Sequence, residues 1–214
     1  MTPQDVITEA RVILQDSRTP YRYSDVVLLG FVNLSLKRLS MLRPDLFMKL
    51  GEIPTTADTV LQTLPSDSMR LSEIFSVKDG NAVTEANREV FDQTYPGWVN
   101  EASGLPKNFI RHIRNPNRFF LYPRPQAGVV LIGEYASSPP TYAINDNVDL
   151  LPDAYLPVVV DGTVYLAESV DNEHVNSNRA KLYLDSFTQA ISLSLQARAL
   201  TDTEEAGFDR KQVI

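Results

Sequence analysis

The sequence predicts an α+β fold in which N- and C-terminal helices pack as one bundle beside a central antiparallel β-rich lobe. Apolar residues recur at helical spacing in the first and last thirds, whereas short β-compatible runs separated by turn formers fill the middle. Segregated runs of helices and strands are typical of α+β rather than alternating α/β folds. We expect residues 1–58 and 142–200 to form the bundle, 59–141 the inserted lobe and 201–214 a C-terminal tail.

The first third carries two helix signals. Thr2 is a good N-cap and Pro3 suits the first helical position, so a helix should begin there. Ser24 caps a second helix, in which apolar residues cover most of the circumference from Val26 to Leu42. Such a helix is either central to a core or buried between subunits, and both interpretations remain open. A short turn over Asp45–Leu50 should follow.

The middle of the chain is typical of strands joined by tight turns. Thr84 is expected to cap a short helix that reaches Gln93, and Asp79–Asn81 is a hairpin-type turn signal. The last three strands should be antiparallel because turn formers connect them. Strands are expected over Thr59–Leu64, Met69–Val77, Asn108–Arg114, Arg118–Tyr122 and Val129–Tyr135.

The last third predicts two more helices. Pro152 opens one that should reach Val170, and Asp171–Asn172 breaks it. The next helix carries a regular apolar stripe formed by Ala180, Leu184, Phe187, Ile191 and Leu195. We treat Thr201–Ile214 as a tail that either orders on a partner or frays, since chain ends are loose unless another surface holds them.

Composition excludes several classes of protein. The chain has 214 residues, no cysteine and a net charge of −7. Without cysteine there is no disulfide or thiolate chemistry, and no apolar run reaches the length of about 18 residues needed to span a membrane. The acidic N-terminus MTPQDVITEA is not a signal peptide. An acidic chain is also unsuited to holding DNA through a broad basic face.

The sequence offers no catalytic, metal or cofactor constellation. His112 and His174 are not at ligand spacing, and the aspartates of Asp146–Asp153 lack the glycine and closing acid of a calcium loop. Glu168 and the acids that follow it are better explained as a solvated turn than as general acids or bases. We therefore expect a protein that is not an enzyme and that works by shape and contact, without cofactors.

Candidate contact residues come from two aromatic and several basic positions. Arg111, Arg114, Arg118 and Arg124 form the one basic concentration, which could be a phosphate-contacting edge, a solvated sheet face or a set of interface anchors. Tyr95 and an exposed Trp98 flank a Pro-Gly breaker, and apolar side chains lie near the C-terminus. The candidate interface residues are Tyr95, Trp98, Arg111, Arg118, Phe208, Val213 and Ile214.

Three blocks of sequence resemble the head-to-tail connector, or portal adaptor, proteins of tailed bacteriophages. The first is ITEARVILQDSRTPYRYSDVVLLGFVNLSLKRLSMLRPDLF, and the second is YPGWVNEASGLPKNFI with FFLYPRPQAGVVLIGEYASSPP after it. The third is LLPDAYLPVVVDGTVYLAESVDNEHVNSNRAKLYLDSF. The LYPRP turn and the last helix pair are the more specific parts, and the blocks together span most of the chain.

The resemblance implies a structural virion protein with no catalytic residues. It implies a ring of identical subunits, twelve in number, that joins the portal protein to the tail nozzle or tube around the DNA channel. DNA would pass without sequence-specific binding, no membrane would be involved, and the protein would be made in the host cytoplasm. The alternatives are another neck or tail-completion protein of the same machine, or a small phage enzyme or nucleic-acid-binding factor.

Overall fold

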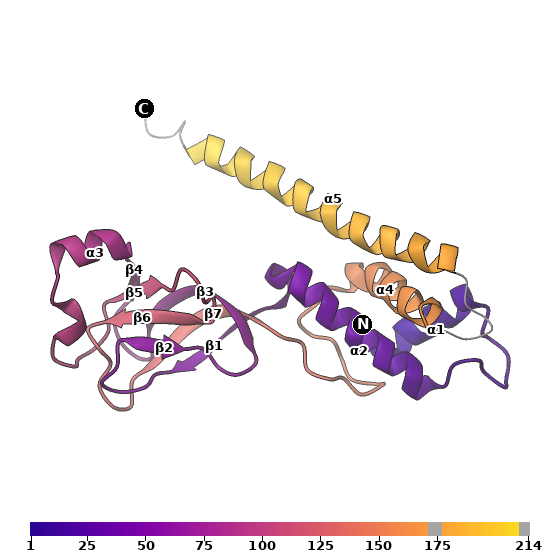
Figure 1. Ribbon diagram of the computed structural model, residues 1–214, viewed down its shortest axis with the longest axis horizontal. Helices are drawn as coiled ribbons and strands as arrows, with labels where there is room; N and C mark the ends of the chain where they lie inside the picture. The colour runs from indigo at the N-terminus through magenta and orange to yellow at the C-terminus, as the bar shows by residue number, and fades with distance from the viewer. Residues whose placement is uncertain (171–176, 210–214) are drawn as a thin grey trace. The chain divides into compact units, whose positions relative to one another are not determined.

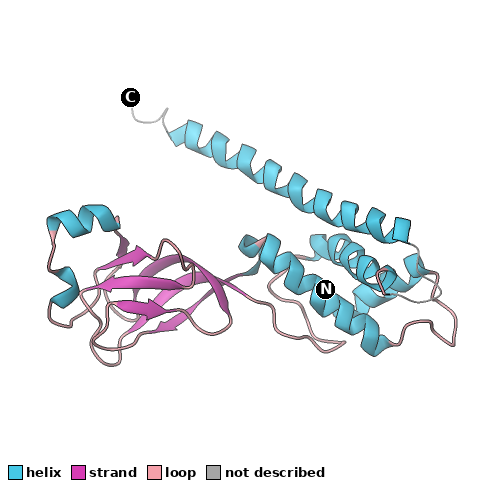
Figure 2. Cartoon of the chain, viewed as in Figure 1, coloured by secondary structure: helices cyan, strands magenta, loops and turns pink. Residues whose placement is uncertain are grey.

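The computed structural model describes residues 1–170 and 177–209, and Figure 1 shows its elements. The chain forms two compact units. One unit joins Met1–Arg43 to Pro140–Ile214, and the other is Pro44–Pro139. Helices make up most of the first unit, and all the described strands lie in the second (Figure 2). The predicted α+β class, with a terminal helical bundle and a central β-rich lobe, is therefore confirmed.

The helical unit is built from four α-helices. They are α1 (Pro3–Leu14), α2 (Asp25–Leu42), α4 (Leu156–Glu168) and α5 (Ser177–Asp209), with the short 3-10 turn η3 (Asp153–Tyr155) before α4. Helix α4 contacts each of the other three helices. Its buried residues include Val159, Val160 and Val164, so its apolar sequence is explained by this central place in the bundle.

The predicted starts of α1 and α2 are confirmed by their capping contacts. The Thr2 hydroxyl accepts a hydrogen bond from the Asp5 backbone N–H, and the Asp5 carboxylate accepts one from the Thr2 N–H, which forms a capping box. The Ser24 hydroxyl accepts from the Val27 N–H at 3.4 Å. These contacts satisfy N–H groups that the first helical turn leaves without partners.

Helices α2 and α4 approach closely at Gly162. A Cβ atom at Gly162 would lie 2.2 Å from Ser35 Oγ and 3.1 Å from Phe187 Cε2. We therefore expect Gly162→Ala to lower the free energy of unfolding by about 1–3 kcal/mol, because the added methyl group of alanine fits only if Ser35 or Phe187 moves. Chemical denaturation followed by circular dichroism would measure this loss.

Gly30 on α2 provides the control for this prediction. A Cβ atom there meets nothing within 4 Å, so Gly30→Ala should instead gain up to about 1 kcal/mol from better helix propensity. Equal effects of the two substitutions would show that helix propensity, not the close approach of α2 and α4, governs the Gly162 position.

The β-rich unit contains two sheets. The first has the order β1-β7-β3 and is antiparallel throughout, with β1 (Met48–Pro54), β7 (Val130–Ser137) and β3 (Ser68–Val77). The second has the order β2-β6-β5-β4, from β2 (Leu61–Thr63), β6 (Arg118–Tyr122), β5 (Asn108–Arg111) and β4 (Thr84–Glu85). Only β4 pairs parallel to its neighbour among the described strands.

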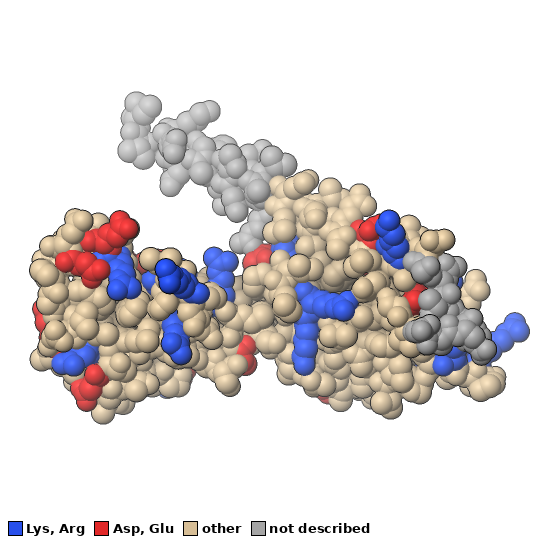
Figure 3. Space-filling model, in the orientation of Figure 1, with Lys and Arg blue, Asp and Glu red and all other residues tan. Residues whose placement is uncertain are grey.

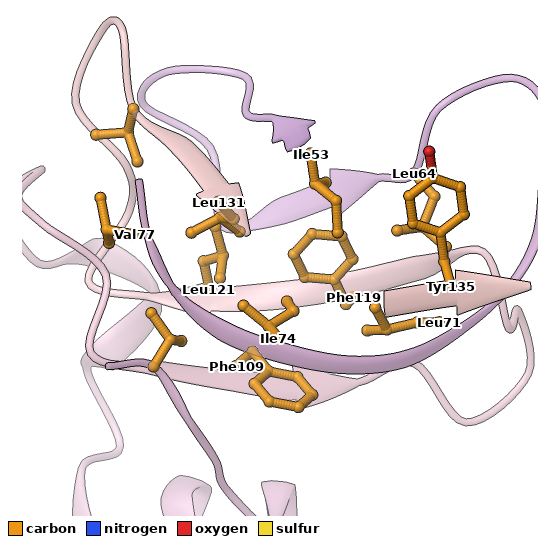
Figure 4. Close-up of a cluster of buried hydrophobic side chains, with 12 residues drawn as sticks. Ile53, Leu64, Leu71, Ile74, Val77, Phe109, Phe119, Leu121, Leu131 and Tyr135 are labelled. Atoms are coloured by element: carbon orange, nitrogen blue, oxygen red, sulfur yellow. The ribbon is translucent and has the colours of Figure 1, made fainter. Parts of the chain in front are cut away.

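Side chains from both sheets fill a single core in this unit. Phe109 and Phe119 come from the second sheet, and Ile53, Ile74 and Leu131 come from the first. Figure 4 shows these side chains gathered between the strands. Burying aromatic and branched apolar groups together supplies the main stabilisation of such a sandwich, at about 25 cal/mol per Å² of apolar surface.

Several element boundaries differ from the predictions. The expected turn over Asp45–Leu50 is partly wrong, because only η1 (Pro44–Phe47) is a turn and the chain then enters β1. Strand β1 was missed because Lys49 and Gly51 interrupt its apolar pattern, and pairing with β7 decides its conformation instead. The helical unit consequently ends at Arg43 rather than residue 58.

Two further predictions in this unit are wrong: the helix start at Thr84 and the end of the predicted strand Asn108–Arg114. Thr84 starts β4, and α3 (Arg88–Thr94) is capped by Asn87, whose Oδ1 accepts from the Glu89 N–H at 2.8 Å. Strand β5 ends at Arg111 because the following turn is closed by His112. The last helix is also longer than predicted, since α5 includes Thr201–Asp209, the first residues of the expected tail.

Candidate interaction surfaces

The seven predicted interface residues fall into three groups. Tyr95 and Trp98 lie beside α3 in the β-rich unit, where Trp98 begins η2 (Trp98–Asn100). Arg111 and Arg118 line one pocket in the same unit. Phe208 belongs to α5, whereas Val213 and Ile214 lie outside the described residues. A partner-binding role for the C-terminus therefore stays a prediction.

Arg111 and Arg118 meet in a pocket with a volume of about 390 Å³, which we call the basic pocket. It is lined by Arg70, Leu71, Arg111, His112, Ile113, Pro116 and Arg118. These residues come from β3, the end of β5, the start of β6 and the turn between β5 and β6. Arg114 lies on that turn but does not line the pocket. Arg124 follows β6, and its Nε donates to the Glu101 carbonyl at 2.9 Å. The basic residues of the sequence thus separate into a pocket pair and two outlying members.

Arg111 holds the wall of the basic pocket together. Its Nε donates to a Glu85 carboxylate oxygen at 2.7 Å, and its Nη1 donates to the Leu71 carbonyl at 2.9 Å. Its Nη2 donates to the Ser72 carbonyl and to Glu85. Because β3 is an edge strand, these carbonyls are not used by a further strand. Arg111 therefore joins β5 to β3 and β4, and it acts within the unit rather than as a free anchor.

Arg70 and Arg118 differ from Arg111 because both are exposed. Within the described part of the chain, neither guanidinium has a hydrogen-bond or ion-pair partner. Sequence reasoning missed Arg70 as a neighbour of Arg118, since their proximity depends on how β3 meets the second sheet. A pair of unpaired guanidinium groups in one pocket is suited to an anionic ligand.

His112 shapes the turn that bounds the basic pocket. Its Nδ1 accepts hydrogen bonds from the backbone N–H groups of Arg114 and Asn115, at 3.2 and 3.1 Å. An imidazole nitrogen that accepts is unprotonated, so the neutral ring carries its proton on Nε2. The ring stacks on Phe120 with a centroid separation of 5.5 Å. His112 is thus a turn-forming residue that also lines the pocket.

Trp98 belongs to an aromatic cluster, and the prediction that it is exposed is wrong. Its side chain is 2% exposed, and its indole N–H donates to Asp92 at 2.7 Å. Its ring lies edge-on to Phe91 and Phe120, at centroid distances of 5.7 and 6.2 Å. The Pro-Gly breaker turns the chain back and brings the indole under α3, where the chain itself covers it. Trp98 therefore supports the surface rather than contacting a partner.

Tyr95 remains on the surface of the same cluster. It is half-exposed, and its ring lies 5.4 Å from that of Phe91 and 6.2 Å from that of Tyr122. The Tyr122 hydroxyl donates to Glu101 at 2.7 Å, and this hydrogen bond raises the pKa of Tyr122. Phe120 contacts both Trp98 and His112, so the aromatic cluster continues into the wall of the basic pocket.

A second candidate surface is apolar and lies on the helical unit. Helix α2 buries Leu28, Val32, Leu36 and Leu39, but its other side exposes large apolar groups. Val26 and Met41 are 79% and 76% exposed, and Leu42 and Leu34 are also exposed. The core interpretation of the Val26–Leu42 segment therefore holds for one side of the helix, and burial of the other side between subunits stays a prediction. Exposed apolar groups in such number mark a contact surface more often than isolated ones do.

An apolar groove adjoins the exposed end of α2. It has a volume of about 210 Å³ and is lined by Ser35, Arg38, Met41, Leu42, Gly162, Tyr165, Leu184, Phe187 and Thr188. Helix α5 buries Ala180, Phe187 and Ile191, as predicted, whereas Leu195 is exposed together with Leu182 and Leu193. The last buried side chain described on α5 is Ile191, although its backbone stays helical to Asp209. We call Val26, Leu34, Met41 and Leu42 with this groove the apolar helical face.

The acidic candidates are placed differently from the prediction. Glu168 is 2% exposed rather than solvated, because α4 carries it inward to Arg22 and Arg179, at 3.6 and 3.7 Å. Asp153 binds the N-terminal amino group. The acids that follow Glu168, and His174, lie outside the described residues. Among described residues, no group of three or more His, Cys, Asp or Glu side chains could hold a metal ion.

The surface carries no broad field of one charge on the face seen in Figure 3, where acidic and basic side chains alternate among uncharged ones. No helix within the described ranges is long and apolar enough to cross a membrane. Among the described residues, the exposed apolar groups of the apolar helical face and the unpaired arginines of the basic pocket are features that the fold itself does not require.

Among the comparisons with known proteins, a family model matches nearly the whole chain. No curated protein matches the sequence. A family model described as SU10 adaptor protein matches residues 1–207, which include both units and the three blocks quoted above. The match confirms the resemblance to head-to-tail adaptors of tailed phages, and proteins of this kind are structural. The chain belongs to the SU10 adaptor protein family.

Proposed function

We propose that this adaptor forms a closed ring between the portal and the tail nozzle or tube, around the DNA channel. The observation that carries the proposal is the apolar helical face, which exposes Met41 and Leu42 next to a groove in a unit whose own core is already filled. Head-to-tail contacts between identical subunits close into rings when the rotation between neighbours allows it. We assign the apolar helical face to such a contact, in a ring of twelve subunits.

The role is structural rather than catalytic in this proposal. The family match supports it. The binding energy of a ring comes from many copies acting together, so each subunit contact need not be strong. The mass of the assembled species, measured for the purified chain alone and with a portal, tests the proposal. A chain that stays monomeric in both samples would overturn it.

Met41→Lys on the apolar helical face should abolish assembly with the portal while leaving the monomer stable. A lysine at this highly exposed position can stay in water in the free subunit, so the free energy of unfolding should change by less than about 0.5 kcal/mol. At an interface the same charge would lose its water and weaken every contact in the ring. Native mass measurement of the mixture reports assembly, and thermal unfolding reports stability.

Val12→Lys provides a matched control. Val12 is also exposed, but it lies on α1 beside the exposed polar residues Thr8, Glu9 and Gln15 and so stands as an isolated apolar group. We expect it to assemble like the unmodified chain. If Met41→Lys also assembles normally, the apolar helical face is not the subunit contact.

A further inference from the structure

The lining side chains of the basic pocket offer hydrogen-bond donors and no free acceptor. Arg70 and Arg118 contribute unpaired guanidinium groups, and the Nδ1 of His112 already accepts two backbone N–H groups. The remaining lining side chains, apart from Arg111, are the apolar groups of Leu71, Ile113 and Pro116. The nearby carboxylate of Glu85 is taken by Arg111 at 2.7 Å. The pocket is therefore arranged to receive an anion.

The donors are held at separate points of a rigid frame. Arg70 lies on β3, paired to Ala136, whereas Arg118 begins β6 and is paired to Thr63. The turn between β5 and β6 is fixed by the two hydrogen bonds to His112 and by the Leu71 N–H, which donates to the Pro116 carbonyl at 2.9 Å. A single carboxylate is fully served by one arginine fork. Guanidinium groups on two different strands better suit an anion with several oxygen acceptors, such as a phosphate.

The surroundings of the pocket favour a large, open ligand. Ile113 at the turn is 84% exposed, and Arg114 beside it is exposed as well. The guanidinium groups of Arg70 and Arg118 are on the surface rather than enclosed. A long polyanion can reach such a pocket with one of its phosphates while its neighbours stay outside, which a closed cavity would prevent.

We propose that the basic pocket contacts phosphate groups of double-stranded DNA. The inference rests on the proposed function, because a ring around the channel brings DNA of any sequence within reach of every subunit. Phosphate contacts carry no sequence information, so they suit a passage through which the whole genome moves. Each subunit would make only one or two such contacts. Their strength would fall with salt, and the net charge of −7 would limit the affinity of a single copy.

Fluorescence anisotropy of the full-length chain with a short labelled duplex tests this inference at low salt. Arg118→Gln should weaken binding about fivefold or more and lower the slope of log K against log salt by about 1. Arg70→Gln should do the same, and two duplexes of unrelated sequence should bind equally. Both arginines are exposed without partners in the described chain, so folding should be unchanged by circular dichroism.

Lys107→Gln is the matched control, because it removes one exposed positive charge from the loop before β5, at the other end of that strand from Arg111. It should change DNA affinity less than twofold. The inference is overturned if no binding is detected, if Lys107→Gln weakens binding as much as Arg118→Gln, or if a poly-glutamate peptide binds the pocket more tightly than the duplex. None of these outcomes affects the mass measurement with the portal, so failure here is distinguishable from failure of the ring proposal.

Discussion

Asp16→Ala is expected to destabilise the helical unit by about 3–5 kcal/mol, the cost of removing one partner from a buried ion pair. The Asp16 side chain is 4% exposed, and its carboxylate lies 2.7 Å from Arg11 Nη1. It also accepts the backbone N–H groups of Arg22 and Tyr23, at 2.6 and 3.1 Å. Alanine would leave these donors buried without an acceptor. Urea unfolding followed by the helical circular dichroism signal measures the loss.

Two related variants separate the charge from the hydrogen bonds. Asp16→Asn keeps a carbonyl oxygen that can accept from the backbone but loses the negative charge, so its effect should be intermediate. Asp25→Ala removes the other partner of Arg11, at 2.6 Å, but that carboxylate is mostly exposed and its loss should cost about 1 kcal/mol or less. If Asp16→Ala costs no more than Asp25→Ala, the buried network does not organise the connection between α1 and α2.

The regular helices could be predicted from sequence because each carries its own signal. Thr2 and Ser24 lie directly before apolar stripes, and their capping contacts are made within the first helical turn, so the sequence alone contains both partners. The stripe of α5 was likewise found from spacing alone, up to Ile191. Helix ends were harder to predict, because α5 continues to Asp209 through residues expected to form a tail, although its last buried side chain described is Ile191.

The β-rich unit was predicted less well because pairing between distant residues decides it. Strand β1 forms where a turn was expected, since β7 supplies its hydrogen bonds from more than seventy positions away. The basic pocket shows the same limit. Arg111 and Arg118 could be named from the sequence, but Arg70 joins them only through the tertiary fold. Trp98 was misjudged because its burial depends on Phe91 and Phe120, which the sequence does not place beside it.

Gly133→Ala is expected to have the other large effect, a loss of about 3 kcal/mol, because β3 lies against β7 at this residue. A Cβ atom at Gly133 would lie 2.6 Å from the Glu73 carbonyl oxygen and 3.0 Å from Ile53 Cδ1. The register of β3 shifts on either side of this point, between Leu71 and Glu73 and between Ile74 and Ser76. The clash is with backbone, so no side-chain rotation relieves it and β3 must move away.

Movement of β3 would reach the basic pocket. Arg111 donates to the Leu71 and Ser72 carbonyls of this strand, so displacing the strand should also disturb Arg70 beside Arg118. Gly51→Ala is the control, because Gly51 pairs with Gly133 on the opposite strand but its Cβ would meet nothing closer than 3.8 Å. We expect Gly51→Ala to cost less than about 1 kcal/mol and to leave DNA affinity unchanged. Equal losses for both variants, measured by chemical denaturation, would show that glycine is needed in these strands for some reason other than the approach of β3.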